Sequence, residues 1–311
     1  MENTKNFIDK QFYALGTINY IKVFDFSDPA ALNLAVARVN EIERHMSAFL
    51  PDSDITRINV QAGKGFVPIH KDTMLLLKHG ALFSELSGGA FQLTIRPLVT
   101  LWGIGKKKNY IPYDMDIKTV QKFVNDKDLL LDEKNCQAFL QKAGQSIDLG
   151  GIAKGYAADE VKRILKEHHV VNAIINLGGN VLTMGTRPDG GWWQIGIQNP
   201  MAATGKHIGI LSLPEKTVVT SGSNERFFIK DGIRYHHILD ARTGKPAQSS
   251  LLGVTVVGDC SLEADALTTA LFVLGMEAGI HLLKEFKAEA LFITDQLSIY
   301  LTDGLRGCFT L

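Results

Sequence analysis

Cysteine is scarce in this sequence of 311 residues, which contains only Cys136, Cys260 and Cys308. A disulfide framework or a zinc site built on cysteine needs more of them, in closer groups, so both are excluded. We therefore expect three ordinary buried thiols.

The sequence also lacks an excess of either charge, with 33 basic and 33 acidic residues. A protein that binds the phosphate backbone of a nucleic acid carries a basic surface, so we expect no nucleic acid partner. No run approaches the ~20 apolar residues of a membrane span, and residues 1–16 contain no apolar core of an export signal. These absences predict a cytoplasmic protein without a membrane span, or an exported one if a leader has been removed.

Hydrophobic residues, in contrast, make up 45% of the chain. A chain of this length and composition can bury a full core and can form two closely packed halves. No internal repeat at a fixed period and no low-complexity tract interrupts it.

Residues 260–275 predict a buried helix that carries chemistry. Ser261 is a suitable cap for its start, and Gly275 is a suitable end. One apolar face carries Leu267, Ala270, Leu271 and Leu274.

Asp265 and Thr269 stand four residues apart on another face of that helix, one above the other. A carboxylate and a hydroxyl in this arrangement offer two hard oxygens, which is half of a Mg²⁺ site. The alternative is that Asp265 only favours the helix N-terminus and that Thr269 bonds back to the carbonyl of residue 265.

Residues 146–160 form a second informative stretch. We expect a strand that ends at Asp148, a tight turn at Gly150-Gly151, and a helix with Lys154 in or near its first turn. A cation there opposes the helix dipole unless an anion binds beside it. The alternative is a lysine that extends to water. The stretch matches neither a Walker loop nor a dinucleotide fingerprint.

Hydrophobic periodicity predicts most of the remaining elements. The predicted strands are residues 16–26, 129–132, 192–198, 206–213, 291–294 and 297–301, and residues 173–182 form one more, broken at Gly178-Gly179. The predicted helices run from Asp28-Pro29 to about Met46, from 72 to 87, and from 116 to 125. We expect residues 46–59 to form a polar loop in which Phe49 covers the core, and the lysines at 106–108 to form a solvated loop.

His236 and His237 lie on a predicted short strand before a tight turn. Successive side chains of a strand point to opposite faces, so only one of the two can face a given site. A histidine has an unperturbed pKa of about 6.5, close to the pH at which a general base operates. His237 is the candidate base, unless it only bonds Asp240 to hold the turn.

Taken together, eight stretches in order resemble the ApbE family of FAD:protein FMN transferases. The matching stretches are residues 15–17, 47–59, 89–103, 148–158, 176–180, 220–222, 237–246 and 263–275. The resemblance implies an α/β (α+β) fold, with two interlocked T-fold-like halves and a cleft between them, in a single domain over residues 1–311.

The resemblance also implies an activity and its partners. FAD is the substrate, Mg²⁺ is the cofactor, and the FMN moiety passes to a Ser or Thr hydroxyl of a partner flavoprotein while AMP leaves. A redox-pump subunit or a reductase is the expected type of acceptor. Two alternatives remain open: a Mg²⁺-dependent FAD pyrophosphatase, and a non-catalytic protein that binds or carries flavin.

The family's site residues map onto this chain as expectations. Asp265, Thr269 and the carbonyl of Gly151 would hold Mg²⁺; Lys154 would supply a cation to the phosphates, and His237 the base. The residues expected to contact FAD are Leu15, Phe49, Ala90, Phe91, Gln92, Asp148, Lys154, Asn176, Ser221, His237 and Ile238. Three positions depart from the family pattern: Gln92 replaces an aspartate, Ala241 a proline, and Phe49 a tyrosine.

Overall fold

The computed structural model describes residues 7–24, 29–105 and 109–311. Its largest feature is a sheet in which every neighbouring pair of strands is antiparallel. The strand order is β1 (Phe7–Ala14), β2 (Thr17–Phe24), β6 (Asn172–Leu177), β7 (Asn180–Met184), β10 (Thr217–Gly222), β15 (Leu251–Gly258), β16 (Glu289–Thr294) and β17 (Ile299–Leu301).

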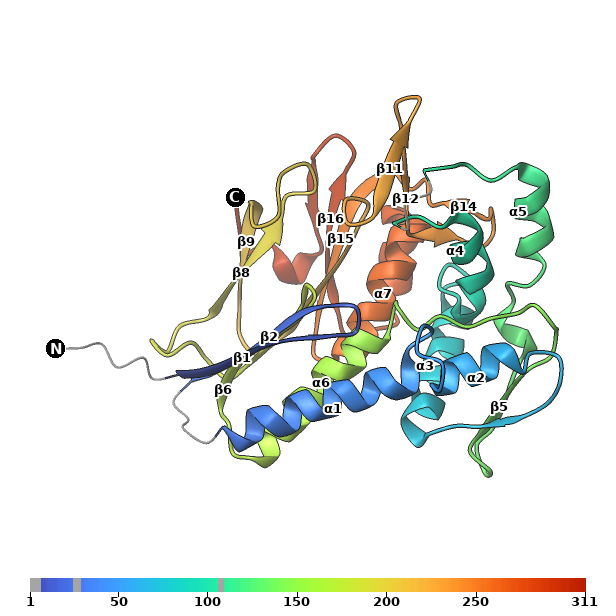
Figure 1. The fold of residues 1–311 in the computed structure, drawn as a ribbon. Coiled ribbons are helices and arrows are strands. Elements are labelled where there is room, and N and C mark those ends of the chain that lie inside the picture. The colour runs from blue at the N-terminus through green and yellow to red at the C-terminus, as the bar shows by residue number, and fades with distance from the viewer. Residues whose placement is uncertain (1–6, 25–28, 106–108) are drawn as a thin grey trace.

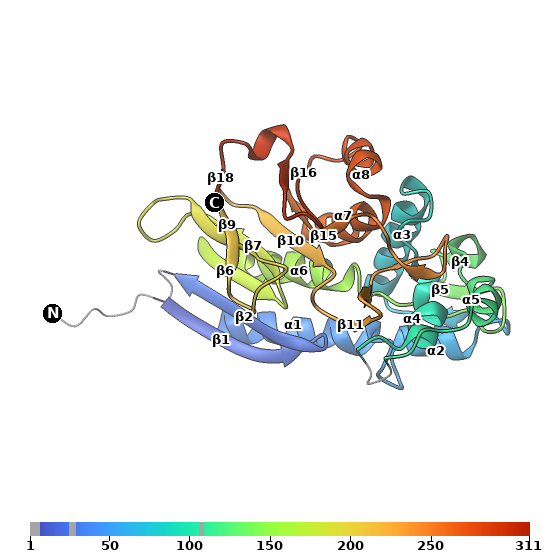
Figure 2. The same ribbon diagram turned by 90° about the horizontal axis from the view of Figure 1, so that it is seen from above.

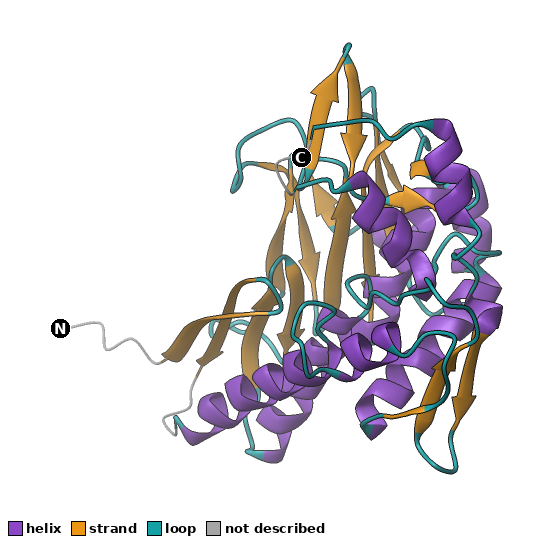
Figure 3. Ribbon diagram, turned by 45° about the vertical axis from the view of Figure 1, so that its right-hand side comes forward, coloured by secondary structure: helices purple, strands orange, loops and turns teal. Residues whose placement is uncertain are grey.

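Helices gather on one side of this sheet, as Figures 1 and 3 show. They are α1 (Ala30–Met46), α2 (Asp54–Val60), α3 (Lys71–Leu86), α4 (Arg96–Trp102), α5 (Asp114–Gln121), α6 (Ala153–Glu167), α7 (Ser261–Leu274) and α8 (Met276–Leu283). Single 3₁₀ turns occur at η1 (Leu93–Ile95), η2 (Asp126–Asp128) and η3 (Asp303–Leu305).

Smaller sheets complete the molecule. They pair β18 (Phe309–Thr310), β9 (His207–Leu213) and β8 (Trp193–Gln198); β3 (Val67–Pro68), β5 (Gln137–Leu140) and β4 (Leu129–Asp132); β11 (Phe227–Lys230) with β12 (Ile233–His236); and β13 (Leu239–Asp240) with β14 (Lys245–Pro246). The expected mixed α/β fold is therefore confirmed.

The central strands are buried on both faces because each face packs on a different layer. Val219 and Val256 join the core under the helices, whereas Val218 and Val257 join the core shared with β8 and β9. Strands covered on both sides read as continuous runs of β-branched residues, as β15 does. In Figure 2, α7 lies beside β15 and α6 lies beside β7.

Helix α7 is the most enclosed of the helices in the described part of the chain. The sequence predicts one apolar face, but the contacts of α7 with α6, β10 and β15 bury residues on nearly every side, including Asp265 and Thr268. A helix surrounded in this way holds its polar side chains at fixed positions, because each must find a partner.

Several predicted elements need correction. No strand ends at Asp148: this residue follows β5 in a loop, and its N–H donates to the carbonyl of Leu93. The loop predicted at 46–59 contains α2, a helix too short to produce a clear periodic pattern. The three cysteines are free but only half buried. Asp28 and the lysines at 106–108 lie outside the described residues. None of the described helices is long and apolar enough to cross a membrane.

Candidate active site

The crossing of α6 and α7 places the carboxylate of Asp265. Gly155 on α6 permits this contact, since a Cβ atom there would lie 2.2 Å from the carbonyl oxygen of Ser261 and 2.8 Å from Cβ of Asp265. The Gly155 N–H donates to Oδ2 of Asp265 at 2.9 Å. The start of α6 and the second turn of α7 are therefore locked together.

The N-terminus of α7 is capped from outside the helix, which corrects the prediction for Ser261. Its N-cap position is Cys260, and the free N–H groups of Ser261 and Leu262 donate to the carboxylate of Asp159 on α6, at 3.0 and 2.9 Å. The Ser261 hydroxyl instead bonds Asn180 at the start of β7. A carboxylate at this position also interacts favourably with the positive end of the helix dipole.

The three expected metal ligands lie close together. Asp265 is only 4% exposed, and Thr269 follows it by one turn of α7. A Cβ atom built on Gly151 would lie 3.3 Å from Oγ1 of Thr269, so the Gly150-Gly151 turn touches this side of the helix. The hydrogen bond back to the carbonyl of Asp265 comes from Thr268, not from Thr269.

Lys154 completes this group of residues. Its Nζ lies 3.8 Å from Oδ1 of Asp265 and donates to the carbonyl of Gly150 at 3.2 Å. Buried carboxylate, hydroxyl and main-chain carbonyl oxygens are the donors that a hard divalent cation takes. The buried negative charge of Asp265 beside the glycine turn therefore fits Mg²⁺, and Lys154 adds positive charge at its edge.

Arg96 joins Asp148 to Phe49, and sequence reasoning missed it although it lies in a matching stretch. Its guanidinium bonds Oδ2 of Asp148 at 3.0 Å and the carbonyl of Ala48 at 2.7 Å, and it lies 4.6 Å from the ring centre of Phe49. Oδ1 of Asp148 accepts the Gly150 N–H at 2.9 Å. The loop after α1 is thus linked to the turn before α6.

Phe49 does not cover the core, as the sequence predicts, because its side chain is 67% exposed. Its ring packs against the Arg96 guanidinium at the protein surface. An exposed aromatic ring held by a cation is a surface on which a flat ligand can stack.

His237 follows directly after β12, and its N–H donates to the carbonyl of Arg226. Burial, followed by the positive charge of Arg226, lowers its pKa to about 4, and Lys154 contributes in the same direction. Its Nδ1 is buried without a hydrogen-bond partner in the described structure. The pKa of His237 therefore lies below the unperturbed value of about 6.5, and the imidazole is neutral at pH 7.

His236 is a structural residue. Its Nε2 lies 3.0 Å from the carbonyl of Ala247, and its ring packs edge-on against Phe272 of α7. The proposed bond between His237 and Asp240 is not the one formed, because Asp240 accepts from the backbone and side chain of Arg242.

Glu225 is a second residue that sequence reasoning missed. Although the residue as a whole is exposed, its carboxyl group is desolvated, and this raises its pKa; Lys154 and Arg226 lower the pKa, and Asp265 raises it further. Glu225 therefore belongs to the same electrostatic group as Lys154 and Asp265. Its only sequence signal is its place after the matching stretch 220–222.

The remaining expected residues have identifiable positions. Ser221 on β10 donates to Thr268 at 2.9 Å, which ties the sheet to α7 next to Asp265. The N–H of Leu15 donates to Glu43 on α1, and Asn176 accepts the Gly179 N–H in the turn between β6 and β7. Leu15 thus lies in the turn between β1 and β2, and Asn176, near the end of β6, holds the turn that follows this strand.

Of residues 90–92, Phe91 contacts the Gly150-Gly151 turn. Ala90 and Phe91 are buried, and the Phe91 ring would lie 3.1 Å from a Cβ atom on Gly151. Gln92 turns toward η2, where its side-chain oxygen accepts the Asp126 N–H at 3.2 Å. An aspartate at position 92 would bring a second carboxylate near that of Asp126.

Ile238 is buried and accepts the Ala247 N–H through its carbonyl, and the carbonyl of Ala241 accepts from Gln121.

Comparison with known proteins identifies relatives over most of the chain. The sequence pattern of the ApbE family matches residues 15–292. A FAD:protein FMN transferase of Klebsiella pneumoniae (strain 342) is 38% identical over 284 residues, which are 91% of this chain and 88% of that protein. One from Treponema pallidum (strain Nichols) is 33% identical over 309 residues, covering 94% of this chain and 85% of that protein. The crystal structure of the ApbE protein of Thermotoga maritima MSB8 superposes with a TM-score of 0.86 at 31% identity, and covers 97% of this chain and 99% of that one.

Proposed function

The chain belongs to the ApbE family, and on that premise we propose that it is a Mg²⁺-dependent transferase that moves the FMN moiety of FAD to a Ser or Thr hydroxyl of a partner flavoprotein. Relatives named FAD:protein FMN transferase support a transferase that acts on FAD and on a protein acceptor. The metal, the acceptor hydroxyl and the leaving group are the further content of the proposal.

The proposed reaction is a phosphoryl transfer. The acceptor hydroxyl oxygen forms a bond to the phosphorus of the FMN half of FAD, and the bond from that phosphorus to the bridging oxygen of the pyrophosphate breaks. AMP leaves with the bridging oxygen, and the hydroxyl proton passes to a base. Catalysis of such a step consists mainly of positioning the groups and stabilising charge on the phosphate oxygens.

Asp265, Thr269 and the carbonyl of Gly151 would hold the metal ion. When bound there, Mg²⁺ would neutralise pyrophosphate charge and polarise the phosphorus under attack. Asp265 would do most to retain the ion, because it is the only anionic group among the three.

Lys154 and His237 would have different roles toward the substrates: Lys154 would stabilise negative charge on the phosphates, and His237 would accept a proton. The Lys154 ammonium, 3.8 Å from Asp265, would move to phosphate oxygens when FAD enters. His237, neutral and with Nδ1 unpaired, would accept the hydroxyl proton. The bound pyrophosphate would raise the pKa of His237, because it offsets the charges of Arg226 and Lys154 that lower it.

Phe49, Arg96, Asp148 and Leu15 would form the side of the site that holds the flavin ring. The remaining contacts with FAD would come from Asn176, Ser221, Ile238 and residues 90–92. The exposed Phe49 ring over Arg96 offers a face for stacking. Asp148 fixes the glycine turn through Gly150 while it positions Arg96. The Gly150-Gly151 turn would thus connect the flavin side of the site to the metal site.

The observation that carries the proposal is the convergence of Asp265, Lys154 and the Gly150-Gly151 turn at the α6–α7 crossing. Asp265→Ala should abolish Mg²⁺-dependent labelling of an acceptor flavoprotein, read as flavin fluorescence that stays with the acceptor on a denaturing gel. Asp116→Ala on exposed α5 is the matched control and should label at the wild-type rate. Labelling by Asp265→Ala at the wild-type rate in low Mg²⁺ would contradict the metal assignment.

A further inference from the structure

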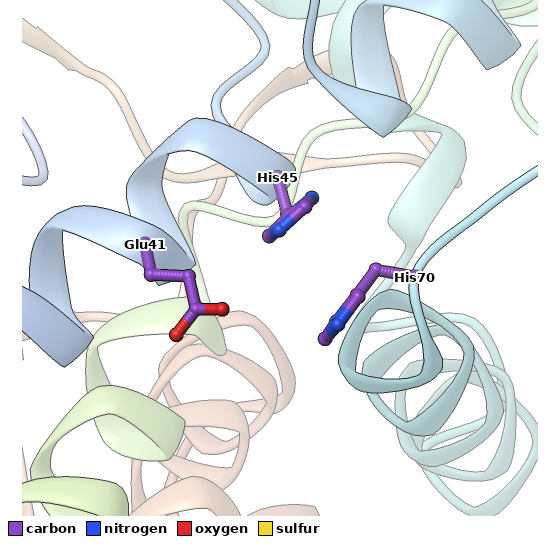
Figure 4. A group of neighbouring side chains, drawn as sticks. All are labelled: Glu41, His45 and His70. Atoms are coloured by element: carbon purple, nitrogen blue, oxygen red, sulfur yellow. The ribbon is translucent and has the colours of Figure 1, made fainter.

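A second group of metal-ligating side chains lies between α1 and α3, away from the Asp265 group. Glu41 and His45 are four residues apart on α1 and share one helix face, and His70 is the N-cap residue of α3. One ligand atom from each lies within 4.8 Å of the others, and within the described residues this is the only such group of three or more His, Cys, Asp or Glu side chains. Figure 4 shows both rings and the Glu41 carboxylate around one space.

Each histidine has a buried carboxylate beside its Nδ1 atom. Nδ1 of His45 lies 3.8 Å from Oδ2 of Asp54, and Nδ1 of His70 lies 3.4 Å from Oδ2 of Asp72. Both carboxylates are buried, and Asp54 is also fixed by the backbone N–H of His70 and the hydroxyl of Thr73. A histidine that binds a metal through one nitrogen typically donates its other N–H to such a carboxylate. Nδ1 of His70 accepts the backbone N–H of Asp72 at 3.3 Å, so metal binding through Nε2 would replace this bond by donation to the Asp72 carboxylate.

The surroundings also carry an unbalanced negative charge. The hydrogen bond from Arg38 lowers the pKa of Glu41, so this carboxylate is ionised. Five carboxylates pair with three guanidinium groups here, namely Glu41, Asp54, Asp72, Glu160 and Glu167 with Arg38, Arg57 and Arg163. These carboxylates and guanidinium groups leave two negative charges, which a bound cation would offset.

We propose that Glu41, His45 and His70 form a second metal site, selective for a borderline divalent cation such as Zn²⁺. Two imidazoles and one carboxylate are a recurring zinc ligand set, with a fourth position left for water. Mg²⁺ prefers oxygen ligands, so this site and the Asp265 group would select different ions.

Binding requires a small rearrangement of the two rings. The imidazoles are stacked, with centres 4.4 Å apart and planes within 11° of parallel, so their in-plane lone pairs run side by side. Both side chains are about a third exposed, at 32% and 31%, so an ion can reach them from solvent. Turning toward a common point would break the stacking and the bond from the Asp72 N–H to Nδ1 of His70. The ion would then connect the C-terminal turn of α1 to the start of α3. This turn of α1 directly precedes the loop that carries Phe49.

Calorimetric titration of Zn²⁺ into chelator-treated full-length protein, in excess Mg²⁺ to occupy oxygen sites, tests the proposal. We expect one saturable Zn²⁺ per chain and a rise in melting temperature, and Co²⁺ in place of Zn²⁺ should give visible absorption bands of an imidazole-bound ion. Asp265→Ala should retain this binding, which separates it from the proposed catalytic metal.

Variants of the ligands provide the comparison. His45→Ala lies on a helix surface and His70→Ser keeps a side chain that can cap α3, so both should fold and lose the saturable binding. Asp72→Asn should weaken it by about 10–100-fold. His281→Ala, on the exposed side of α8, should bind as the wild type does. Equal binding by wild type and His45→Ala, or no saturable binding by the wild type, would leave only a stacked histidine pair and overturn the proposal.

Discussion

The imidazole of His237 is kept neutral by its surroundings, and this decides how activity should depend on pH. Burial, then the charges of Arg226, His236 and Lys154, lower its pKa to about 4. A general base is inactive when protonated, so activity falls as pH falls through this pKa. We expect the acid limb of kcat/KM, which reports the free enzyme, near pH 4 rather than near the unperturbed 6.5. The limb of kcat should lie at higher pH, because bound pyrophosphate raises the pKa. A limb of kcat/KM at 6.5 or above would contradict the lowered pKa of His237, and an acid limb that is unchanged in His237→Ala would exclude His237 as this base.

The neighbouring histidines should fail in different ways when replaced. His237→Ala should slow flavin transfer by about 10²–10⁴-fold, the usual contribution of a general base, with little change in FAD affinity. His236→Ala removes the bond to Ala247 and the contact with Phe272, so it should lower stability by about 1–3 kcal/mol. Initial rates and melting temperatures of both variants check this. A purely thermal defect in His237→Ala would identify it as structural.

The sequence identifies these two histidines and predicts that His237 is the base, but it does not reveal the surroundings of either ring. Alternation along a strand correctly suggests that they differ, but no sequence pattern reveals that Ala247 and Phe272, far along the chain, enclose His236. The lowered pKa of His237 depends on Arg226 and Lys154, which come together only in the folded chain. Arg96 and Glu225 escape notice for the same reason.

At the level of elements, the contact between α6 and α7 depends on a missing side chain. A methyl group at Gly155 would collide with the Ser261 carbonyl, a main-chain atom that cannot swing away. Gly155→Ala should destabilise the protein by about 1–3 kcal/mol through overpacking, and should disturb Asp265 by displacing the N–H that bonds it. Denaturant unfolding measures the first effect, with Lys166→Ala on the exposed face of α6 as the control. An unchanged midpoint for Gly155→Ala would show that the helices can separate without cost.

Helices and strands that are long enough to show a clear hydrophobic periodicity are predicted well from this sequence. Both α6 and α7 are recognised from their patterns. Residues 173–182 are predicted as one strand broken at the double glycine, whereas the chain reverses there and forms the hairpin of β6 and β7. The seven-residue helix α2 is not recognised, because it is too short for a period to show. The cap of α7 is also misplaced, since Asp159 lies about a hundred residues earlier and only tertiary packing brings it to Ser261.

For the molecule as a whole, the candidate site is assembled from segments that are far apart in the sequence. Ser221 on β10 bonds α7, Asp159 on α6 caps α7, and Arg96 joins the loop after α1 to the turn before α6. A site assembled from so many segments forms only when the whole fold does. The order of the matching stretches therefore predicts the site better than any one of them.

The most direct test of the account is the intact mass of a candidate acceptor flavoprotein after incubation with this protein, FAD and Mg²⁺, with AMP measured in the same sample. We predict that the acceptor gains the mass of one FMN moiety in phosphoester linkage, that one AMP appears per modified acceptor, and that replacing the modified Ser or Thr by Ala removes both. Release of FMN and AMP with the acceptor mass unchanged would contradict the transferase and identify a FAD pyrophosphatase.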